Sequence, residues 1–193
     1  MFLTILIWAV VLTLGSSQSV NDCPAAIPKD THLQVHGGLC YQFVLTPHKT
    51  HTDAKKACEA NGGTLAIVSS KAIQDYIYDQ VLHTYKSAYG KFWIGLDDIA
   101  TEDAFVWEDG SAFSYENFAP GQGSQNTSLA GHVTHPNEDC VLIDASDHGR
   151  WHDYPCDRSS FLFVTTVEAH SYICQYAPAG ITQAPATTII FVT

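Results

Sequence analysis

Basic residues are scarce in this 193-residue sequence. Lys and Arg total nine against twenty Asp and Glu, so the formal net charge is −11. The nine cationic residues form no cluster. Nucleic acids, heparin and anionic membranes bind through a basic patch or stripe, so the composition makes all three poor partners for this chain.

Motifs for catalysis are also missing. The sequence has no Gly-x-Ser-x-Gly elbow, no His-Glu-x-x-His and no phosphate-binding glycine-rich loop. The acidic pair Glu108 and Asp109 lies in a Trp-Glu-Asp-Gly turn, which has a plain structural explanation. The sequence therefore favours a binding protein over an enzyme.

No apolar run reaches the roughly 20 residues that span a bilayer. Residues 1–19 carry no charged side chain, and the apolar run 2–14 is followed by small polar residues. This pattern indicates a secretory signal peptide at 1–19, with a buried strand as the alternative. We expect a secreted domain over 20–177 without a membrane anchor, followed by a short Ala-, Thr- and Pro-containing tail at 178–193.

Six cysteines are present and Cys-x-x-Cys spacing is not. Without metal-ligand spacing, and with secretion into an oxidising compartment expected, disulfides are favoured over a zinc site. Six cysteines allow 15 pairings, and composition does not choose among them. The cysteines are Cys23, Cys40, Cys58, Cys140, Cys156 and Cys174.

The stretch 138–156 predicts a hairpin with a cysteine near each end. The run 141–143 is short, apolar and β-branched, as in a strand. The turn signal 147–149 follows, and Trp151 restarts a strand. We expect one outer face to carry the carboxylates of Glu138, Asp144 and Asp153, which are oxygen ligands of the kind that hard cations prefer.

Two helices are expected before this hairpin. Apolar spacing predicts a helix over 52–60 with Thr52 as its N-cap, and a second helix after Ser69 or Ser70. Further strands are predicted over 40–45, 92–98, 105–110, 161–167 and 170–176. The stretch 119–137 has no periodicity, and a loop of this length inside a domain is usually functional or disordered.

Residues 92–96, 107–110, 138–140 and 151–156 resemble the C-type lectin-like domain family, and the run Trp-Ile-Gly-Leu at 93–96 is its most distinctive element. The resemblance covers 23–176. It implies an α+β fold with two helices packed on small antiparallel sheets and a long ligand loop. It also implies the disulfides Cys23–Cys40, Cys58–Cys174 and Cys140–Cys156.

The resemblance implies a secreted module that recognises glycans or glycoproteins, including those on microbes in innate immunity. The family holds Ca²⁺ with a Glu/Gln-Pro-Asn/Asp triplet, a Glu before Asp-Cys, and Trp-Asn-Asp. Glu138 and Asp153 match this pattern, whereas His152 replaces the Asn. The triplet position has no proline. The implied calcium site is Gln122, Ser124, Glu138, His152 and Asp153.

Several departures favour an alternative, in which the domain has lost metal-dependent sugar binding and acts through a protein or a surface. The segment 135–137 spells part of the triplet but lies directly before Glu138. Asn126 begins a glycosylation sequon in the loop, where a glycan would border the site. In this alternative Trp107 and Trp151 are core residues, and the acids are solvated or paired with Arg150 or Arg158.

The histidines suggest a second metal hypothesis. Imidazole nitrogen suits Zn²⁺ better than Ca²⁺. Four histidines lie in and near the long loop, and tetrahedral Zn²⁺ accepts His together with carboxylate. The candidate zinc ligands are His132, His135, His148 and His152.

Overall fold

The computed structural model describes residues 18–87, 89–123, 138–161 and 164–179. Along the chain the elements are η1 (Val20–Asp22), β1 (Leu33–His36), β2 (Leu39–Lys49), α1 (His51–Glu59), β3 (Thr64–Leu65), α2 (Lys71–Asp79), the π-helical η2 (Gln80–Thr84), β4 (Lys91–Asp97), β5 (Val106–Trp107), β6 (Cys140–Asp144), η3 (Ala145–Asp147), β7 (Arg150–Tyr154), β8 (Arg158–Phe161), β9 (Val164–Val167) and β10 (His170–Tyr176).

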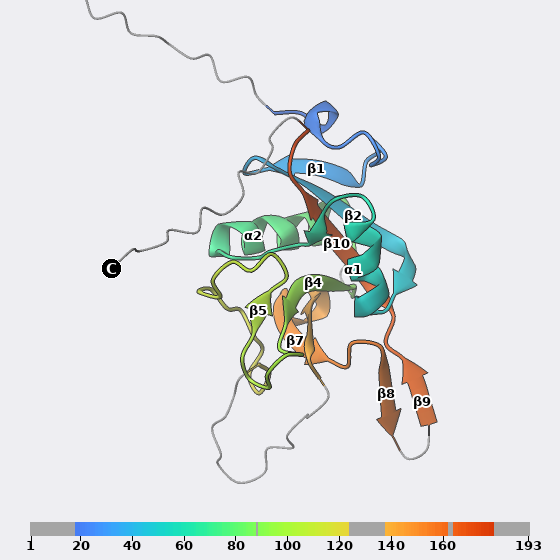
Figure 1. Ribbon diagram of the computed structural model, residues 1–193, viewed down its shortest axis with the longest axis vertical. Coiled ribbons are helices and arrows are strands. Elements are labelled where there is room, and N and C mark those ends of the chain that lie inside the picture. The colour runs from blue at the N-terminus through green and yellow to red at the C-terminus, as the bar shows by residue number, and fades with distance from the viewer. Residues whose placement is uncertain (1–17, 88, 124–137, 162–163, 180–193) are drawn as a thin grey trace, which may run out of the picture.

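The described strands form an eight-stranded sheet and a separate two-stranded hairpin. The sheet order is β1-β2-β10-β4-β6-β7, with β3 paired to β10 and β5 paired to β4. β10 runs parallel to β4 and antiparallel to β2. In the view of Figure 1, α1 and α2 lie on either side of β10. The α+β fold class is confirmed. The main sheet is mixed rather than antiparallel, because the last strand, β10, lies between β2 and β4 and runs parallel to β4.

The two helices begin at side-chain caps. Oγ1 of Thr50 accepts a hydrogen bond of 3.3 Å from the N–H of Asp53, so Thr50 rather than Thr52 caps α1. Oγ of Ser70 accepts from the N–H of Ile73 at 3.4 Å, which confirms Ser70 as one of the two predicted caps of α2. The predicted N-cap of α1 is wrong by two residues, because Thr50 and Thr52 both precede the apolar residues of this helix.

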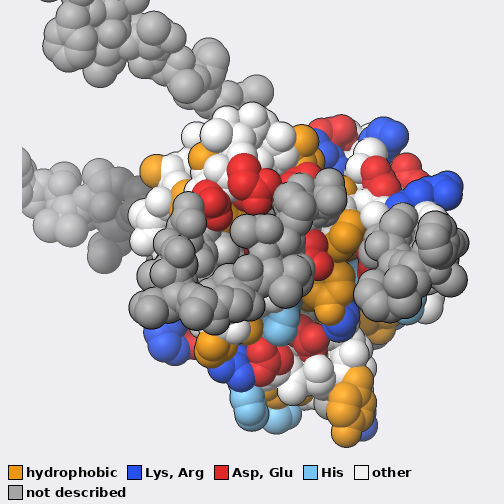
Figure 2. All heavy atoms as spheres, turned by 90° about the horizontal axis from the view of Figure 1, so that it is seen from below, with side chains coloured by type: hydrophobic (Ala, Val, Ile, Leu, Met, Phe, Trp, Pro, Cys, Tyr) orange, Lys and Arg blue, Asp and Glu red, His pale blue; other side chains and the backbone are white. Residues whose placement is uncertain are grey.

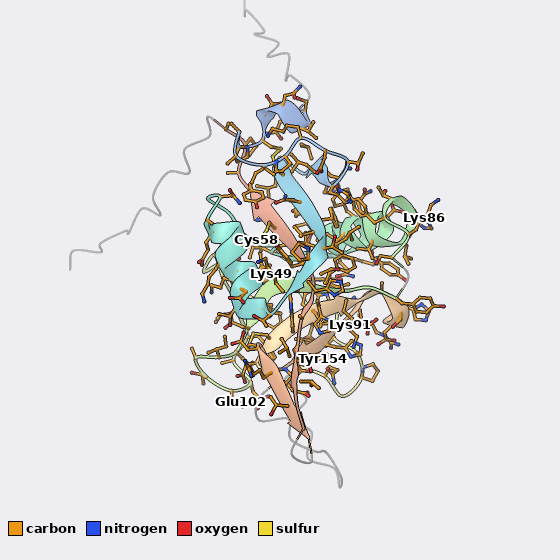
Figure 3. All side chains as sticks on the ribbon, turned by 90° about the vertical axis from the view of Figure 1, so that its right-hand side faces the viewer. Lys49, Cys58, Lys86, Lys91, Glu102 and Tyr154 are labelled. Atoms are coloured by element: carbon orange, nitrogen blue, oxygen red, sulfur yellow. A yellow bond between two sulfur atoms is a disulfide. The ribbon has the colours of Figure 1, made fainter. Side chains whose placement is uncertain are left out.

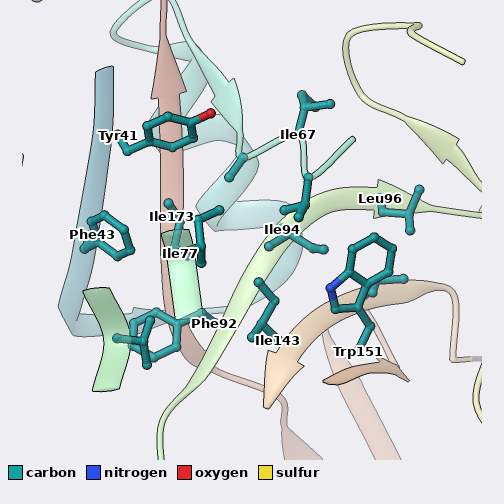
Figure 4. Packing of buried hydrophobic residues seen from close by; sticks show 14 of the residues in the cluster. Tyr41, Phe43, Ile67, Ile77, Phe92, Ile94, Leu96, Ile143, Trp151 and Ile173 are labelled. Carbon is teal, nitrogen blue, oxygen red and sulfur yellow. The ribbon is translucent and has the colours of Figure 1, made fainter. Parts of the chain in front are cut away.

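Aromatic and aliphatic side chains fill the space between α2 and the sheet. Trp93, Trp107 and Trp151 are at most 2% exposed. Figure 4 shows Ile77 of α2 packed toward Ile173 of β10 in this core. Trp107 and Trp151 are therefore core residues. Replacing a buried aromatic of this size with Ala typically costs about 3–5 kcal/mol of folding free energy.

The three disulfides are Cys23–Cys40, Cys58–Cys174 and Cys140–Cys156, the pairs that the resemblance implied. The single strand predicted over 161–167 is wrong. Its place is taken by β8 and β9, which pair antiparallel as the two-stranded hairpin. No helix within the described ranges is both long and apolar enough to cross a membrane.

Candidate functional site

The predicted hairpin over 138–156 is confirmed as β6 and β7. The strands pair antiparallel, with Cys140 opposite Tyr154. The turn uses η3 and His148, whose φ of 57° is left-handed. Glu138 and Asp139 come just before β6, and Asp153 lies near the end of β7. The antiparallel pairing therefore brings these three acidic residues to the same end of the hairpin.

Asp144 does not share that end. It is 6% exposed, and its Oδ1 accepts a hydrogen bond of 2.8 Å from the N–H of Ser146. Its Oδ2 lies 3.8 Å from Nζ of Lys91. The prediction that Asp144 lines an exposed face with Glu138 and Asp153 is therefore wrong, because the carboxylate caps η3 at the opposite end of β6.

Asp153 is tied to the beginning of the long loop. Its N–H donates to Oε1 of Gln122 at 3.0 Å, and its Oδ2 accepts from the N–H of Gly123 at 3.0 Å. Two of the predicted site residues, Gln122 and Asp153, therefore meet in the structure. The amide oxygen of Gln122, however, is engaged by the backbone of β7.

His152 contacts a different acidic residue. Its Nε2 lies 2.8 Å from Oδ2 of Asp147, which also pairs with Arg150. Partial burial raises the pKa of Asp147, but the hydrogen bonds from Arg150 and His152 outweigh this effect and the net shift is downward. The imidazole that replaces the family's Asn is thus held by an acid of the hairpin turn.

Asp98, just after β4, is a buried carboxylate that sequence reasoning did not single out. It is 4% exposed, its Oδ2 accepts from the N–H of Asp103 at 2.8 Å, and its N–H donates to the carbonyl of Asp139 at 3.1 Å. Its Oδ1 is buried and has no hydrogen-bond partner within the described residues. Burial raises the pKa of Asp98 to about 6, and the nearby charges of Glu102, Asp139 and Asp153 also raise it.

Carboxylates from three segments therefore converge on one region. Figure 2 shows several acidic side chains on the lower face of the molecule, interspersed with basic and hydrophobic ones. Ca²⁺ takes 6–8 oxygen ligands from carboxylates, carbonyls and waters. A buried carboxylate oxygen without a partner, close to further carboxylates, is a donor set that fits a hard cation. Asp98, Asp139 and Asp153 therefore offer the ligand type that Ca²⁺ takes, although among the described residues their oxygens do not all lie within 4.8 Å of one another.

A local signal for Asp98 exists in the sequence. The pair 97–98 ends the apolar strand that begins at Phe92, and polar residues at a strand end often carry function. In the sequence, Asp139 could be recognised only as the first residue of the Asp-Cys pair at 139–140. Other predicted residues lie outside the described part of the chain: Ser124, Asn126, His132 and His135.

The described residues contain one group of three or more His, Cys, Asp and Glu side chains that lie close enough together to hold a metal ion. It comprises His51, Cys140 and Cys156, whose candidate ligand atoms lie within 4.8 Å of one another. Both cysteines belong to one disulfide, so neither offers a thiolate. Of the predicted zinc ligands, His148 is exposed and His152 contacts Asp147.

Comparison with known proteins decides the family. The family model described as "Lectin C-type domain" matches residues 48–164. The chain belongs to the C-type lectin domain family. This family is a non-enzymatic binding module, in agreement with the absence of catalytic motifs.

Proteins similar to this C-type lectin domain carry different descriptions. Versican core protein of Rattus norvegicus is 36% identical over 120 residues, which span 62% of the chain but 4% of versican. The cow carbohydrate-recognition domain of CD23, solved in the presence of the oligosaccharide GlcNAc2Man3, is 26% identical with a TM-score of 0.56, covering 78% of this chain and 95% of that one. A calcium-independent type II antifreeze protein is 25% identical with a TM-score of 0.57, covering 81% and 95%.

Proposed function

We propose that this domain is a secreted recognition module that binds glycans or glycoproteins at the face of Glu138, Asp139 and Asp153, with Ca²⁺ among the carboxylates. The observation that carries the proposal is the buried carboxylate of Asp98, whose Oδ1 lacks a hydrogen-bond partner among the described residues. Burying a charge without a partner is costly, and a bound cation removes that cost. The similarity to the cow CD23 domain, which was solved in the presence of an oligosaccharide, supports a glycan as the ligand.

The chain's own residues would hold the ion from three segments. Asp98 follows β4, Asp139 precedes β6 and Asp153 lies on β7. A backbone hydrogen bond from the N–H of Asp98 to the carbonyl of Asp139 already joins the first two segments. The carboxylate of Asp153 accepts a hydrogen bond from the N–H of Gly123, at the beginning of the long loop. Bound Ca²⁺ would supply positive charge and open coordination positions for ligand oxygens. The carboxylates would then fix the relative positions of the segments that form the binding face.

A second candidate function is recognition of a protein or a surface without metal. It is favoured by Gln122, whose oxygen bonds the backbone of Asp153, and by His152, which bonds Asp147. Both side chains are at positions where the family supplies ligands, and both are engaged inside the domain. A relative described as calcium-independent shares this fold.

Four further features belong to the proposal. Residues 1–19 direct secretion, and 178–193 form a tail after the domain. A glycan on Asn126 would lie in the loop beside the binding face. Zn²⁺ on His132, His135, His148 and His152 is the alternative metal.

The test is thermal unfolding of the protein in EDTA, in millimolar Ca²⁺ and in micromolar Zn²⁺. A ligand at 100 times its Kd stabilises by about 2.7 kcal/mol, which raises the midpoint by several degrees. We expect a rise with Ca²⁺ that Asp98→Asn abolishes. Asp79→Asn is the matched control, because Asp79 is an exposed acid on α2 and the change in net charge is the same.

Glycan binding is then measured on an array in Ca²⁺ and in EDTA. Binding that disappears in EDTA and in Asp98→Asn supports the calcium-dependent function. A Ca²⁺ response without any glycan binding would contradict the choice of ligand. Absence of any Ca²⁺ response would contradict the metal and leave the second candidate.

A further inference from the structure

A groove of about 480 Å³ is lined by residues other than those of the carboxylate face. It lies between the end of β2, the segment that joins η2 to β4, and the beginning of β10. Ten residues line it, and none of them is acidic. Four carry basic side chains: His48, Lys86, Lys91 and His170. With His counted as neutral at pH 7, the charges of the lining are those of Lys86 and Lys91, in a chain with twenty acidic residues against nine Lys and Arg.

The two lysines have different surroundings. Lys86 is exposed and has no ion pair among the residues that the structure describes. Lys91 is half-buried, donates to the hydroxyl of Tyr154, and lies 4.4 Å from the centroid of that ring. Asp144 is 3.8 Å from Nζ of Lys91. Lys91 is therefore a fixed charge in the groove, whereas Lys86 is available to a ligand.

Two histidines, His48 and His170, and one tyrosine, Tyr89, also line the groove. His170 is held in place: Nε2 lies 3.3 Å from Oε2 of Glu168, and the ring centroid lies 5.1 Å from that of Trp93. His48 is exposed. Tyr89 is 89% exposed, so its aromatic ring stands at the rim in water. The ring of Tyr89 therefore offers a ligand an apolar surface beside the lysine side chains of the groove.

We propose that this groove is a second binding site, which takes an acidic sugar residue without a metal ion. The carboxylate or sulfate of the sugar would bind Lys86 in the field of Lys91, and the C–H face of its ring would pack on Tyr89. Charge-assisted hydrogen bonds to an anion are about twice as strong as neutral ones. The volume lies within the range of small-ligand sites, which is roughly 300–1,000 Å³.

The net charge of the chain limits the size of the ligand. At −11 the whole molecule repels a long polyanion, so the attraction is confined to the groove. A mono- or disaccharide with one acidic group fits this condition. Figure 3 shows Lys86 and Glu102 on opposite sides of the molecule. Lys91 begins β4 opposite Asp144, whereas Asp98 follows the other end of β4, so the groove and the carboxylate face lie at opposite ends of this strand. This inference therefore goes beyond the proposed function.

The test is isothermal titration in EDTA and low salt, with protein expressed from the full sequence. The probes are lactose, unsulfated chondroitin disaccharide and its monosulfated form, which separate a neutral sugar, a carboxylate and an added sulfate. We expect binding of one or both acidic disaccharides, and none of lactose. Lys86→Glu should weaken it at least tenfold, because a lost hydrogen bond to a charged group becomes a repulsion. Tyr89→Ala should weaken it severalfold.

The matched control is Lys56→Glu on the exposed face of α1, which makes the same change in net charge. Near-native affinity in Lys56→Glu, with loss in Lys86→Glu, supports the site. Equal losses in the two variants would show non-specific electrostatics and overturn it. Equal binding of lactose would also overturn the proposal, because the groove would then not select an acidic group. Binding that needs Ca²⁺, or that is lost in Asp98→Asn, would overturn it as well, because the ligand would then lie at the carboxylate face. Far-UV circular dichroism and thermal midpoints matching the wild type show that each variant is folded.

Discussion

The N–H of Gly123 donates a hydrogen bond of 3.0 Å to Oδ2 of Asp153. The N–H of Asp153 returns a bond to the side chain of Gln122, so the turn over 119–123 and β7 are joined in both directions. The carboxylate of Asp153 therefore fixes the point at which the chain leaves the core for the loop. A residue expected to bind a ligand also has a structural role.

Gly123→Ala tests that junction. Gly123 has φ of +70°, and a Cβ there would lie 2.6 Å from the ring of Phe118, a partly buried residue that packs on the core. Left-handed backbone and overpacking together should cost about 2–4 kcal/mol of unfolding free energy, measured by urea denaturation. Gly110→Ala is the control: its φ is +74°, but a Cβ would meet nothing within 4 Å. Equal losses in the two variants would exclude the Phe118 contact as a cause.

The disulfides should differ in their contribution to stability. Cys58–Cys174 joins residues 116 apart in sequence, and Cys140–Cys156 joins residues 16 apart. In the chain-entropy model the longer loop contributes about 4–5 kcal/mol and the shorter about 3. Double replacement by Ala should therefore lower the unfolding free energy more for the first pair. A larger loss for Cys140–Cys156 would show that packing at the site end of the hairpin outweighs loop entropy.

Local signals explain which elements could be predicted. β10 was predicted at its observed bounds, His170–Tyr176, because an apolar and aromatic run there is followed by the Ala-, Thr- and Pro-rich tail. The β6–β7 hairpin followed from an apolar run and a turn. The run 161–167 is strand-like throughout, so nothing local marked the reversal between β8 and β9. The disulfide pairing came only from the family resemblance, because composition left 15 possibilities open.

The site was harder to predict, because its contacts are non-local. Glu138 and Asp153 followed from the hairpin pattern and from the family resemblance. The burial of Asp98 and its hydrogen bond to Asp139 depend on a chain reversal of about 40 residues, which spacing does not reveal. Asp144 looked like an exposed acid, yet tertiary contacts bury it beside Lys91. The basic groove combines three separate segments, and its lysines appear isolated in the sequence.

A buried hydrogen bond under the site gives the next prediction. Nε1 of Trp151 donates to Oε1 of Gln74 at 2.7 Å, and Gln74 is 4% exposed. Gln74→Leu keeps the volume but leaves the indole N–H without its acceptor, which should cost about 1–3 kcal/mol. The double variant Gln74→Leu, Trp151→Phe removes both partners. The unfolding free energy that the double variant loses, measured by urea denaturation, should be smaller than the sum of the losses of the two single variants. A loss equal to that sum would show that the hydrogen bond adds no stability.

Glu108 predicts a dependence of stability on pH. Its side chain is 1% exposed, and burial raises its pKa from 4.5 to about 7, although Lys55, 3.7 Å away, acts to lower it. The folded state then keeps a proton that the unfolded state releases. The stabilisation is full below pH 4.5 and is lost as pH rises to about 7. Relative to Glu108→Gln, the wild type should lose about 2–4 kcal/mol across this window, measured by urea denaturation at each pH.

Glu108→Gln also affects His51, because Nε2 of His51 lies 3.8 Å from Oε1 of Glu108. Burial lowers the pKa of His51 from 6.5 to about 4, so its contribution to stability is lost as pH falls through that range, the opposite direction. The difference profile therefore reports the buried pair of Glu108 and His51 as a whole. Asp109→Asn is the control, because Asp109 is an exposed neighbour and its difference profile should be flat. If the difference between the wild type and Glu108→Gln were also constant with pH, Glu108 would be ionised over the whole range from pH 4.5 to about 7. The charge of Lys55 would then offset the effect of burial on the pKa of Glu108.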